Sequence, residues 1–233
     1  MLMNSKSYLY LLGGSQAYSD FLDDFISESG GRQARIAILD QSISALNNHK
    51  SKIIDPLVDF GVCDFEFIAP DNSGYLNVGK TIDCLKRATG LFIGGGHTPT
   101  YHKLYTSEPF KSTIQNHFAN GVPVAGLSAG AILCMKECQL TPDETGLKDT
   151  MLVTGLSLAK EFVLGVHYSE WDALQEVLEA MTQAQIQTGI GLDEAACIKL
   201  ENGEIVKIYG QNAFQITLKD FESGEYSQSI LKI

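Results

Sequence analysis

The chain has 233 residues, of which 44% are hydrophobic, and 17 Lys and Arg against 28 Asp and Glu give it a net charge of −11. A chain of this length can bury one sizeable core without disulfides or metals, so we expect a single domain over 1–233. The basic residues are scattered, which argues against nucleic acid and anionic membranes as partners.

The N-terminal residues 1–15 carry an apolar run of only five residues and no small-x-small cleavage site. They indicate neither a signal peptide nor a membrane span. The five cysteines are an odd number spread through apolar segments, which is typical of buried thiols in a reducing compartment. We therefore expect a cytoplasmic protein.

Short apolar runs alternate with amphipathic stretches in the first part of the chain. The expected strands are 8–14 (YLYLLGG), 35–40 (RIAILD), 64–70 (DFEFIAP), 91–96 (LFIGGG) and 122–128 (VPVAGLS). The expected helices are 19–31, a stretch ending near Phe60, 80–90, 109–121 and 129–137. This repeated βα pattern predicts an α/β fold with a mostly parallel, doubly wound sheet and helices on both faces.

The C-terminal part is different and predicts two β-hairpins. Residues 195–210 (AACIKLENGEIVKIYG) contain two β-like runs around Asn202-Gly203, a pair that supplies the positive φ angles of a type I′ turn. Residues 214–233 have the pattern of a second hairpin. No repeat, low-complexity stretch or linker indicates a domain boundary.

Residues 126–130 (GLSAG) place Ser128 between two glycines where an apolar run gives way to small helix-forming residues. The segment fits G-x-S-x-G in the required strand–turn–helix context, which indicates a nucleophile on a strained turn. The N–H of Ala129 would then form half of an oxyanion hole. The alternative is a set of small residues at a close contact between strand and helix.

A second group of glycines, Gly94 to Gly96, follows the apolar run 91–93. Three glycines at a strand end allow the backbone to approach a ligand and turn an N–H inward. We expect Gly95 or Gly96 to supply the second oxyanion donor; the alternative is a tight βα turn.

Among the five histidines, His167 is the candidate base. It ends the apolar run 162–168 and precedes 169–181 (SEWDALQEVLEAM), an expected helix with Ser169 as its N-cap. At the C-terminus of a strand in the parallel sheet it would lie beside the turn that carries Ser128. The alternative is a histidine partly buried near Trp171. We expect His49 and His117 on the surface, and His97 and His102 to line a pocket or to be structural.

The candidate acids are Asp193 and Glu194, adjacent in 189–198 (GIGLDEAACI) after another short apolar run. A carboxylate would fix the tautomer of the base, in the chain order Ser, His, acid. A solvated turn is the ordinary alternative. The order of α/β-hydrolases, Ser, acid, His, would instead use Asp143 or Asp149, our second choice.

Four motifs occur in a fixed order ahead of a hairpin: LFIGGGHT (91–98), GLSAG (126–130), VHY (166–168) and GIGLDE (189–194). Together they resemble the peptidase E and cyanophycinase family of serine peptidases. The resemblance extends from LLGGS (11–15) to about Ala213, nearly the whole chain. It implies a three-layer α/β/α sandwich related to class I glutamine amidotransferases, with serine in place of cysteine.

The resemblance also implies the roles of the site residues. Ser128 would be the nucleophile, His167 the base and Glu194 the acid, with Ala129 and a residue of the glycine turn as the oxyanion hole. The expected reaction is hydrolysis of short peptides through an acyl-enzyme, without cofactor or metal. The expected partner is a small peptide, and a homodimer is left open. Activity should decline as the pH drops through the imidazole range.

Two features depart from the family pattern. His97 stands where the family commonly has Asn or a related polar residue, which alters the pocket beside the oxyanion hole. Members that prefer aspartyl or β-aspartyl substrates tend to have arginines in the helix after the histidine, whereas this chain has Glu170, Asp172 and Glu176. These carboxylates would repel an acidic side chain, so another small peptide is favoured over cyanophycin.

Three alternatives compete with the hydrolase. Residues 74–81 (GYLNVGKT) satisfy the Walker A pattern, which predicts a nucleotide hydrolase with Lys80 on phosphates and Thr81 on magnesium. A binding module on the same sandwich with a lapsed triad is the second. Cys134 and Cys138, four apart on the expected helix, could share a metal, but no further ligands stand at suitable spacing, which favours core packing.

Overall fold

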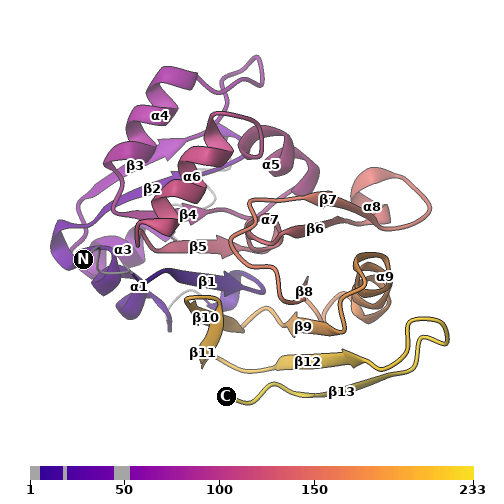
Figure 1. Cartoon of the computed structure of the whole chain (residues 1–233). Coiled ribbons are helices and arrows are strands. Elements are labelled where there is room, and N and C mark those ends of the chain that lie inside the picture. Colours follow the sequence, from indigo (N-terminus) through magenta and orange to yellow (C-terminus); the bar gives the residue numbers. More distant parts are fainter. Residues whose placement is uncertain (1–5, 18–19, 45–52) are drawn as a thin grey trace, which may run out of the picture.

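The computed structural model describes residues 6–17, 20–44 and 53–233, and its main feature is a seven-stranded sheet (Figure 1). The strand order is β11 (Glu204–Tyr209), β10 (Cys197–Glu201), β1 (Tyr8–Leu12), β5 (Val124–Leu127), β4 (Gly90–Ile93), β2 (Arg35–Leu39) and β3 (Asp64–Ile68). The five strands β1, β5, β4, β2 and β3 are parallel to one another, whereas β10 is antiparallel to β1 and β11 is antiparallel to β10. The predicted mostly parallel sheet is confirmed.

Helices cover both faces of this sheet. One face carries α1 (Leu22–Glu28) and α3 (Asp55–Asp59), and the other carries α4 (Val78–Arg87), α5 (Thr98–Tyr105), α6 (Phe110–Ala119) and α7 (Ala129–Cys134). Alternate residues of β1 show the division, because Leu9 and Leu11 enter the core under α4 to α7, and Tyr10 and Leu12 enter the other core. The three-layer α/β/α sandwich is thereby confirmed.

A second sheet of four strands stands beside the first in the order β13 (Tyr226–Ile230), β12 (Ala213–Leu218), β9 (Thr188–Leu192) and β8 (Val163–Val166). Helix α9 (Leu174–Ala184) packs on one of its faces, and the opposite face joins the main core. We had expected the strands before His167 and Glu194 to lie in the sheet that carries Ser128, and this prediction is wrong. Apolar alternation marks a strand but does not say which sheet it joins.

Both predicted hairpins are present. Strands β10 and β11 are joined by Asn202 and Gly203, whose φ angles of 54° and 92° are those of a type I′ turn. Strands β12 and β13 pair antiparallel and extend the second sheet. The hairpins thus complete two different sheets.

Several element boundaries differ from the prediction. Helix α7 ends at Cys134, and the next residues form an antiparallel pair, β6 (Glu137–Leu140) and β7 (Met151–Thr154), with α8 (Pro142–Thr145) between them. Cys138 is thus on a strand, and both Cys134 and Cys138 are buried in the main core. Of the five thiols only Cys63 is exposed. Helix α5 was not predicted, because Pro, Thr and Tyr are weak helix formers.

Helix α9 begins at Leu174 with Ala173 at its N-cap, so the predicted cap Ser169 is wrong. Residues 168–173 form turns instead, with a positive φ of 51° at Asp172. No helix in 6–17, 20–44 and 53–233 is long and apolar enough to cross a membrane. His49 lies outside the described residues.

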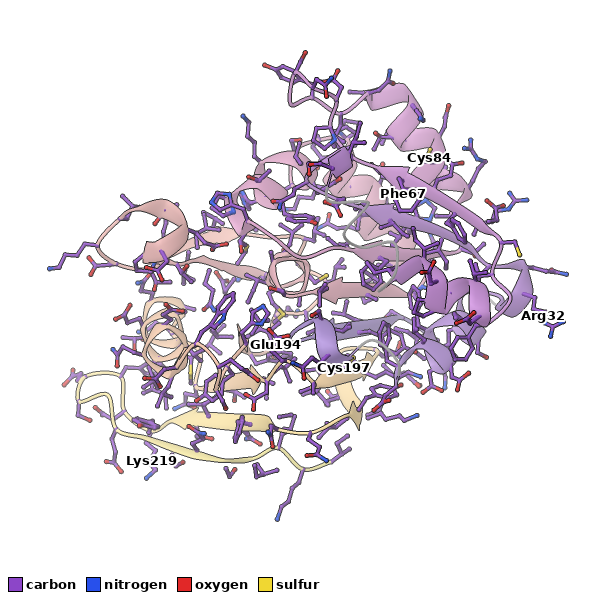
Figure 2. The ribbon with its side chains drawn as sticks, turned by 180° about the vertical axis from the view of Figure 1, so that it is seen from behind. Arg32, Phe67, Cys84, Glu194, Cys197 and Lys219 are labelled. Atoms are coloured by element: carbon purple, nitrogen blue, oxygen red, sulfur yellow. The ribbon has the colours of Figure 1, made fainter. Side chains whose placement is uncertain are left out.

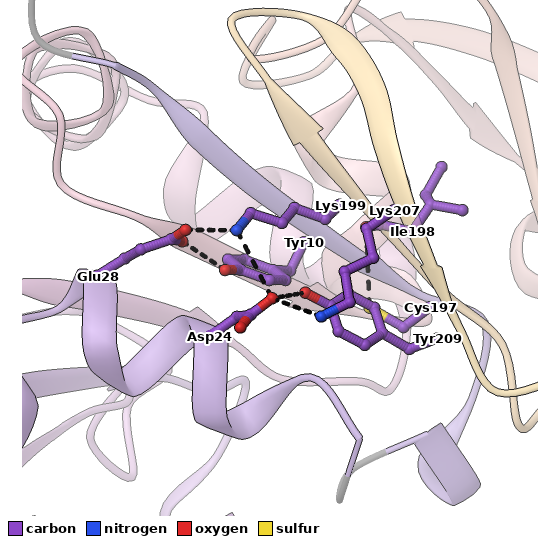
Figure 3. A network of polar contacts seen from close by, with 8 residues as sticks. All are labelled: Tyr10, Asp24, Glu28, Cys197, Ile198, Lys199, Lys207 and Tyr209. Carbon is purple, nitrogen blue, oxygen red and sulfur yellow. Dashed lines mark hydrogen bonds and ion pairs between the residues drawn. The ribbon is translucent and has the colours of Figure 1, made fainter. Parts of the chain in front are cut away.

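A polar network fastens α1 to the β10–β11 hairpin (Figure 3). Lys199 forms ion pairs with Glu28 and Asp24, and Asp24 also accepts hydrogen bonds from Lys207 and Tyr209. The short 3₁₀ helices η1 (Ser15–Ala17) and η2 (Gly31–Gln33) flank α1 in the chain. The antiparallel edge of the large sheet is in this way tied to the helix layer.

Candidate active site

Ser128 lies at the sharp turn between β5 and α7 with φ 50° and ψ −114°, a conformation that non-glycine residues rarely adopt. Its N–H donates to the carbonyl of Leu12 at 2.9 Å. Both neighbouring glycines are sterically required: a Cβ at Gly126 would lie 2.6 Å from the carbonyl oxygen of Gly130, and one at Gly130 would collide with the carbonyl of Ile93. The turn therefore has the geometry of a nucleophile elbow.

Ser128, His167 and Glu194 form a continuous chain of hydrogen bonds. Oγ of Ser128 is 2.7 Å from Nε2 of His167, and Nδ1 of His167 is 2.5 Å from Oε1 of Glu194. Because a carboxylate only accepts, Nδ1 carries the proton and Nε2 is free to accept from the serine hydroxyl. His167 is 8% exposed, so its imidazole is largely shielded from water. This arrangement can deprotonate the hydroxyl during an attack on a carbonyl.

The loop after β1 holds the other two members of this chain in place. The carbonyl of Gly13 accepts the N–H of His167 at 3.2 Å, and the N–H of Ser15 donates to Oε2 of Glu194 at 3.0 Å. A Cβ at Gly14 would collide with Oε2 of Glu194. Sequence reasoning did not assign a role to these residues, although two glycines directly after a strand are the same signal that marked Gly94 to Gly96. Glu194 lies near the middle of the view in Figure 2.

The alternative acids have other positions. Asp193 is buried next to Glu194, but its Oδ1 accepts the N–H of Ser169 at 2.8 Å and so fixes the turn before α9. Asp143 and Asp149 are exposed, the first on α8 and the second after it. The acid that contacts the imidazole is Glu194, which the residues alone had left open.

The glycine turn faces the same site as the start of α7. The hydroxyl of Tyr101 donates to the carbonyl of Gly95 at 3.2 Å. Because the peptide plane is trans, the N–H of Gly96 points the opposite way, and Gly96 lines a cavity together with Ala129. A Cβ at Gly96, where φ is +150°, would collide with the side chain of Gln41. The turn thus needs a glycine there.

The cavity beside Ser128 has a volume of about 550 Å³. Its lining residues are Gly96, His97, Thr98, Ser128, Ala129, Ile132, Gln139, Thr141, Asp143, Glu144, Val166, Trp171, Ala173 and Glu176. Part of this wall is apolar and part is acidic, and none of the described residues in it is Lys or Arg. The volume lies within the range of about 300–1,000 Å³ that is typical of ligand sites.

Of the three acids after His167, only Glu176 lines the cavity. The side chain of Glu170 accepts a hydrogen bond from the N–H of Glu194 at 3.2 Å. Asp172 is exposed and does not line the cavity. Burial, and next the nearby carboxylate of Asp143, raise the pKa of Glu176 above its ordinary value. The negative charge in the cavity therefore comes from α8 as well as α9.

The other described histidines are engaged outside the serine chain. His97 lines the cavity with Nε2 donating to the carbonyl of Glu144 at 3.1 Å and Nδ1 accepting from Thr100 at 2.9 Å. His102 contacts a backbone carbonyl of β7 at 3.2 Å. His117 is half-buried rather than on the surface, and burial lowers its pKa.

Trp171 is a further residue of the site that sequence reasoning had not assigned to it. Its ring stacks on the imidazole of His167 with 3.9 Å between the ring centroids and 25° between the planes. The side chain is 67% exposed although it is the only tryptophan of the chain. It restricts the orientation of the imidazole and covers one wall of the cavity.

The Walker-like segment has a different local structure. Asp71 accepts the N–H groups of Ser73 and Tyr75, and the side chain of Asn77 caps α4 by accepting the N–H of Lys80 at 3.0 Å. These backbone donors are used within the chain and are not arranged around an anion. The segment follows the edge strand β3, whereas Ser128 follows the central strand β5.

The family model of Peptidase family S51 matches residues 77–208, more than half of the chain, and the protein belongs to this family. It is therefore a peptidase that hydrolyses peptide bonds. Similar proteins include the cyanophycinase of Synechococcus elongatus, 19% identical over 91% of this chain and 68% of that protein. The cyanophycinase of Geminocystis herdmanii is 20% identical over 95% of this chain and 84% of that protein.

Solved structures share the fold. A peptidase from an acI-B1 actinobacterium aligns with a TM-score of 0.70 at 14% identity, covering 97% of this chain and 95% of that one. A putative peptidase E from Listeria monocytogenes EGD-e aligns with a TM-score of 0.67 at 15% identity, covering 89% and 100%. At these identities the likeness concerns the fold.

Proposed function

We propose that Ser128, His167 and Glu194 are the catalytic triad of a peptidase that hydrolyses short peptides through an acyl-enzyme. The observation that carries this proposal is the hydrogen-bonded chain, with 2.7 Å from Oγ to Nε2 and 2.5 Å from Nδ1 to Oε1. The strained backbone of Ser128 supports it, because such strain is typical of functional turns. Neither a cofactor nor a metal is required.

Each residue has a defined step in this reaction. Oγ of Ser128 attacks the carbonyl carbon of the scissile bond while Nε2 of His167 takes its proton, and Glu194 stabilises the imidazolium. The N–H groups of Ala129 and Gly96 would bind the oxyanion, each contributing about 3–4 kcal/mol to the transition state. His167 then protonates the leaving amine, and water attacks the acyl-enzyme with the same base.

The substrate we propose is a short peptide without an acidic side chain at the attacked residue. Similar proteins are named cyanophycinases. The acidic cavity wall, with Glu176, Asp143 and Glu144, would repel an aspartyl side chain, which favours another peptide over cyanophycin.

A fluorophosphonate probe tests the triad, because only an activated serine reacts quickly. We expect rapid labelling of the wild type, none in Ser128→Ala, and a steep decrease in His167→Ala. A screen of dipeptides and tripeptides, with cyanophycin as one arm and Ser128→Ala as the control, then gives the substrate class. Absence of Ser128-dependent labelling and hydrolysis would favour a binding module whose triad is inactive. Thermal stabilisation of the protein by a nucleotide with magnesium would favour the nucleotide-hydrolase alternative.

A further inference from the structure

The cavity beside Ser128 combines two kinds of wall that suit one kind of side chain. Ile132, Val166, Trp171 and Ala173 form an apolar part, and Asp143, Glu144 and Glu176 form an acidic part. Lysine and arginine have the same division, an apolar stem and a cationic head.

The acidic groups are not equivalent. Oε1 of Glu144 accepts the N–H of Thr98 at 2.7 Å, and the carboxylate also caps α8. Asp143 is exposed to water on the first turn of α8. Glu176 is partly buried and forms no ion pair with the described residues. It is therefore the carboxylate with most to gain from a cation, and burial, followed by the nearby carboxylate of Asp143, raises its pKa.

Gln139 provides an independent observation at the same wall. The residue is 5% exposed and lines the cavity, and its Nε2 donates to the carbonyl of Leu164 at 3.0 Å. Its buried Oε1 accepts no hydrogen bond from any described residue. Buried polar atoms are rarely left without a partner in a folded protein, and a rotation of the amide toward the cavity would let this one accept a hydrogen bond from an ammonium or guanidinium group.

We propose that this cavity binds the basic side chain of a lysine or arginine at the residue whose carbonyl Ser128 attacks, with Glu176 as the counter-charge. The inference rests on the proposed function for the position of the scissile bond. The basic head would lie between Glu176 and Gln139, with its methylene stem along the apolar wall.

Binding to the Ser128→Ala variant tests the charge preference without turnover. Three acetylated peptide amides, Ac-Ala-Xaa-Ala-NH₂ with Xaa as Lys, norleucine or Asp, differ only in the side chain, and acetylation removes the α-amine as a second cation. We expect the lysine peptide to bind about tenfold more tightly than the norleucine peptide, and the aspartate peptide to bind most weakly.

Glu176→Gln in the Ser128→Ala background should bring the lysine-to-norleucine ratio to within about threefold of unity. The matched control is Glu179→Gln, one turn further along α9, where the side chain contacts Thr150 and Gln175 and does not line this cavity. That variant should keep the ratio. Equal binding of the lysine and norleucine peptides, no measurable binding of the lysine peptide, or a ratio unaffected by Glu176→Gln would overturn the proposal.

The same peptides with wild-type protein separate this inference from the proposed function. Selective binding of the lysine peptide without any Ser128-dependent hydrolysis would refute the peptidase proposal and retain the charge preference. Ser128-dependent hydrolysis without a preference for lysine would refute the charge preference and retain the peptidase proposal.

Discussion

The backbone N–H of Ser15 donates a hydrogen bond to Oε2 of Glu194 at 3.0 Å, and Oε1 of the same carboxylate contacts His167. The two residues stand 179 positions apart. This contact fixes the acid from the side opposite the imidazole, which makes the loop after β1 a positioning element of the site.

Gly14→Ala should disturb this contact, because the added Cβ would collide with Oε2 of Glu194. Displacing the carboxylate by about 1 Å should lower kcat/KM by about 100-fold. Gly79→Ala is the control, since its Cβ would meet only Asn77 Oδ1 at 3.8 Å. Its kcat/KM should stay at the wild-type level. Wild-type kcat/KM in Gly14→Ala would show that the loop does not position the acid.

The identity of the acid can be tested with three variants of equal charge change. Glu194→Gln should lower kcat by about 10⁴-fold, because an amide at this position favours the wrong tautomer of the base. Asp193→Asn should reduce kcat by at most about tenfold, through the turn at Ser169. Asp149→Asn should have no effect. Steady-state kinetics of the three variants decides between these acids, and a larger loss in Asp193→Asn would reassign the role.

Trp171 should report on the stacked imidazole of His167 by fluorescence. It is the only tryptophan, and its ring lies 3.9 Å from the imidazole. Because the two rings are in contact, removing the imidazole in His167→Gln should change the emission of Trp171. The control His102→Gln should keep the emission of the wild type. If the emission of His167→Gln equals that of the wild type, the stacking does not exist in solution.

Lys199 should contribute strongly to stability, because its side chain is 11% exposed and lies between Glu28 and Asp24 (Figure 3). Lys199→Met leaves these carboxylates without their buried cation and should lower the free energy of unfolding by about 3 kcal/mol. Lys219→Met removes an exposed ion pair with Glu225 and should cost less than about 1 kcal/mol. Urea denaturation measures both variants, and equal losses would contradict the expected difference.

Asp24 should make stability depend on acidic pH. The hydrogen bonds from Tyr209 and then Lys207 hold the pKa of Asp24 in the folded protein below its usual value of 3.8. The unfolded chain therefore takes up this proton first, so the stabilisation is complete above about pH 4 and is lost as the pH falls through the folded value. Urea midpoints between pH 6 and pH 3 should fall less in Asp24→Asn than in the wild type. The exposed neighbour Asp23→Asn should follow the wild type.

The sequence by itself determined the α/β class, the five parallel strands of the large sheet and both hairpins. These features follow from local signals, namely apolar runs of strand length, amphipathic stretches and an Asn-Gly pair whose backbone preference needs no distant partner. The elbow at Ser128 was predictable for the same reason. Its two glycines and the change from strand to helix formers lie within a few residues.

The tertiary structure decided what depends on distant contacts. Asp193 and Glu194 are adjacent acids that the sequence does not distinguish, and only the folded chain places Glu194 against His167 and the loop after β1 and Asp193 against Ser169. The sequence likewise did not indicate that β8 and β9 belong to a second sheet. Nor did it indicate that acids of α8 line the cavity together with Glu176. Hydrophobic pattern specifies which residues are buried, whereas the partner of each buried polar group is set by elements that meet only in the folded chain.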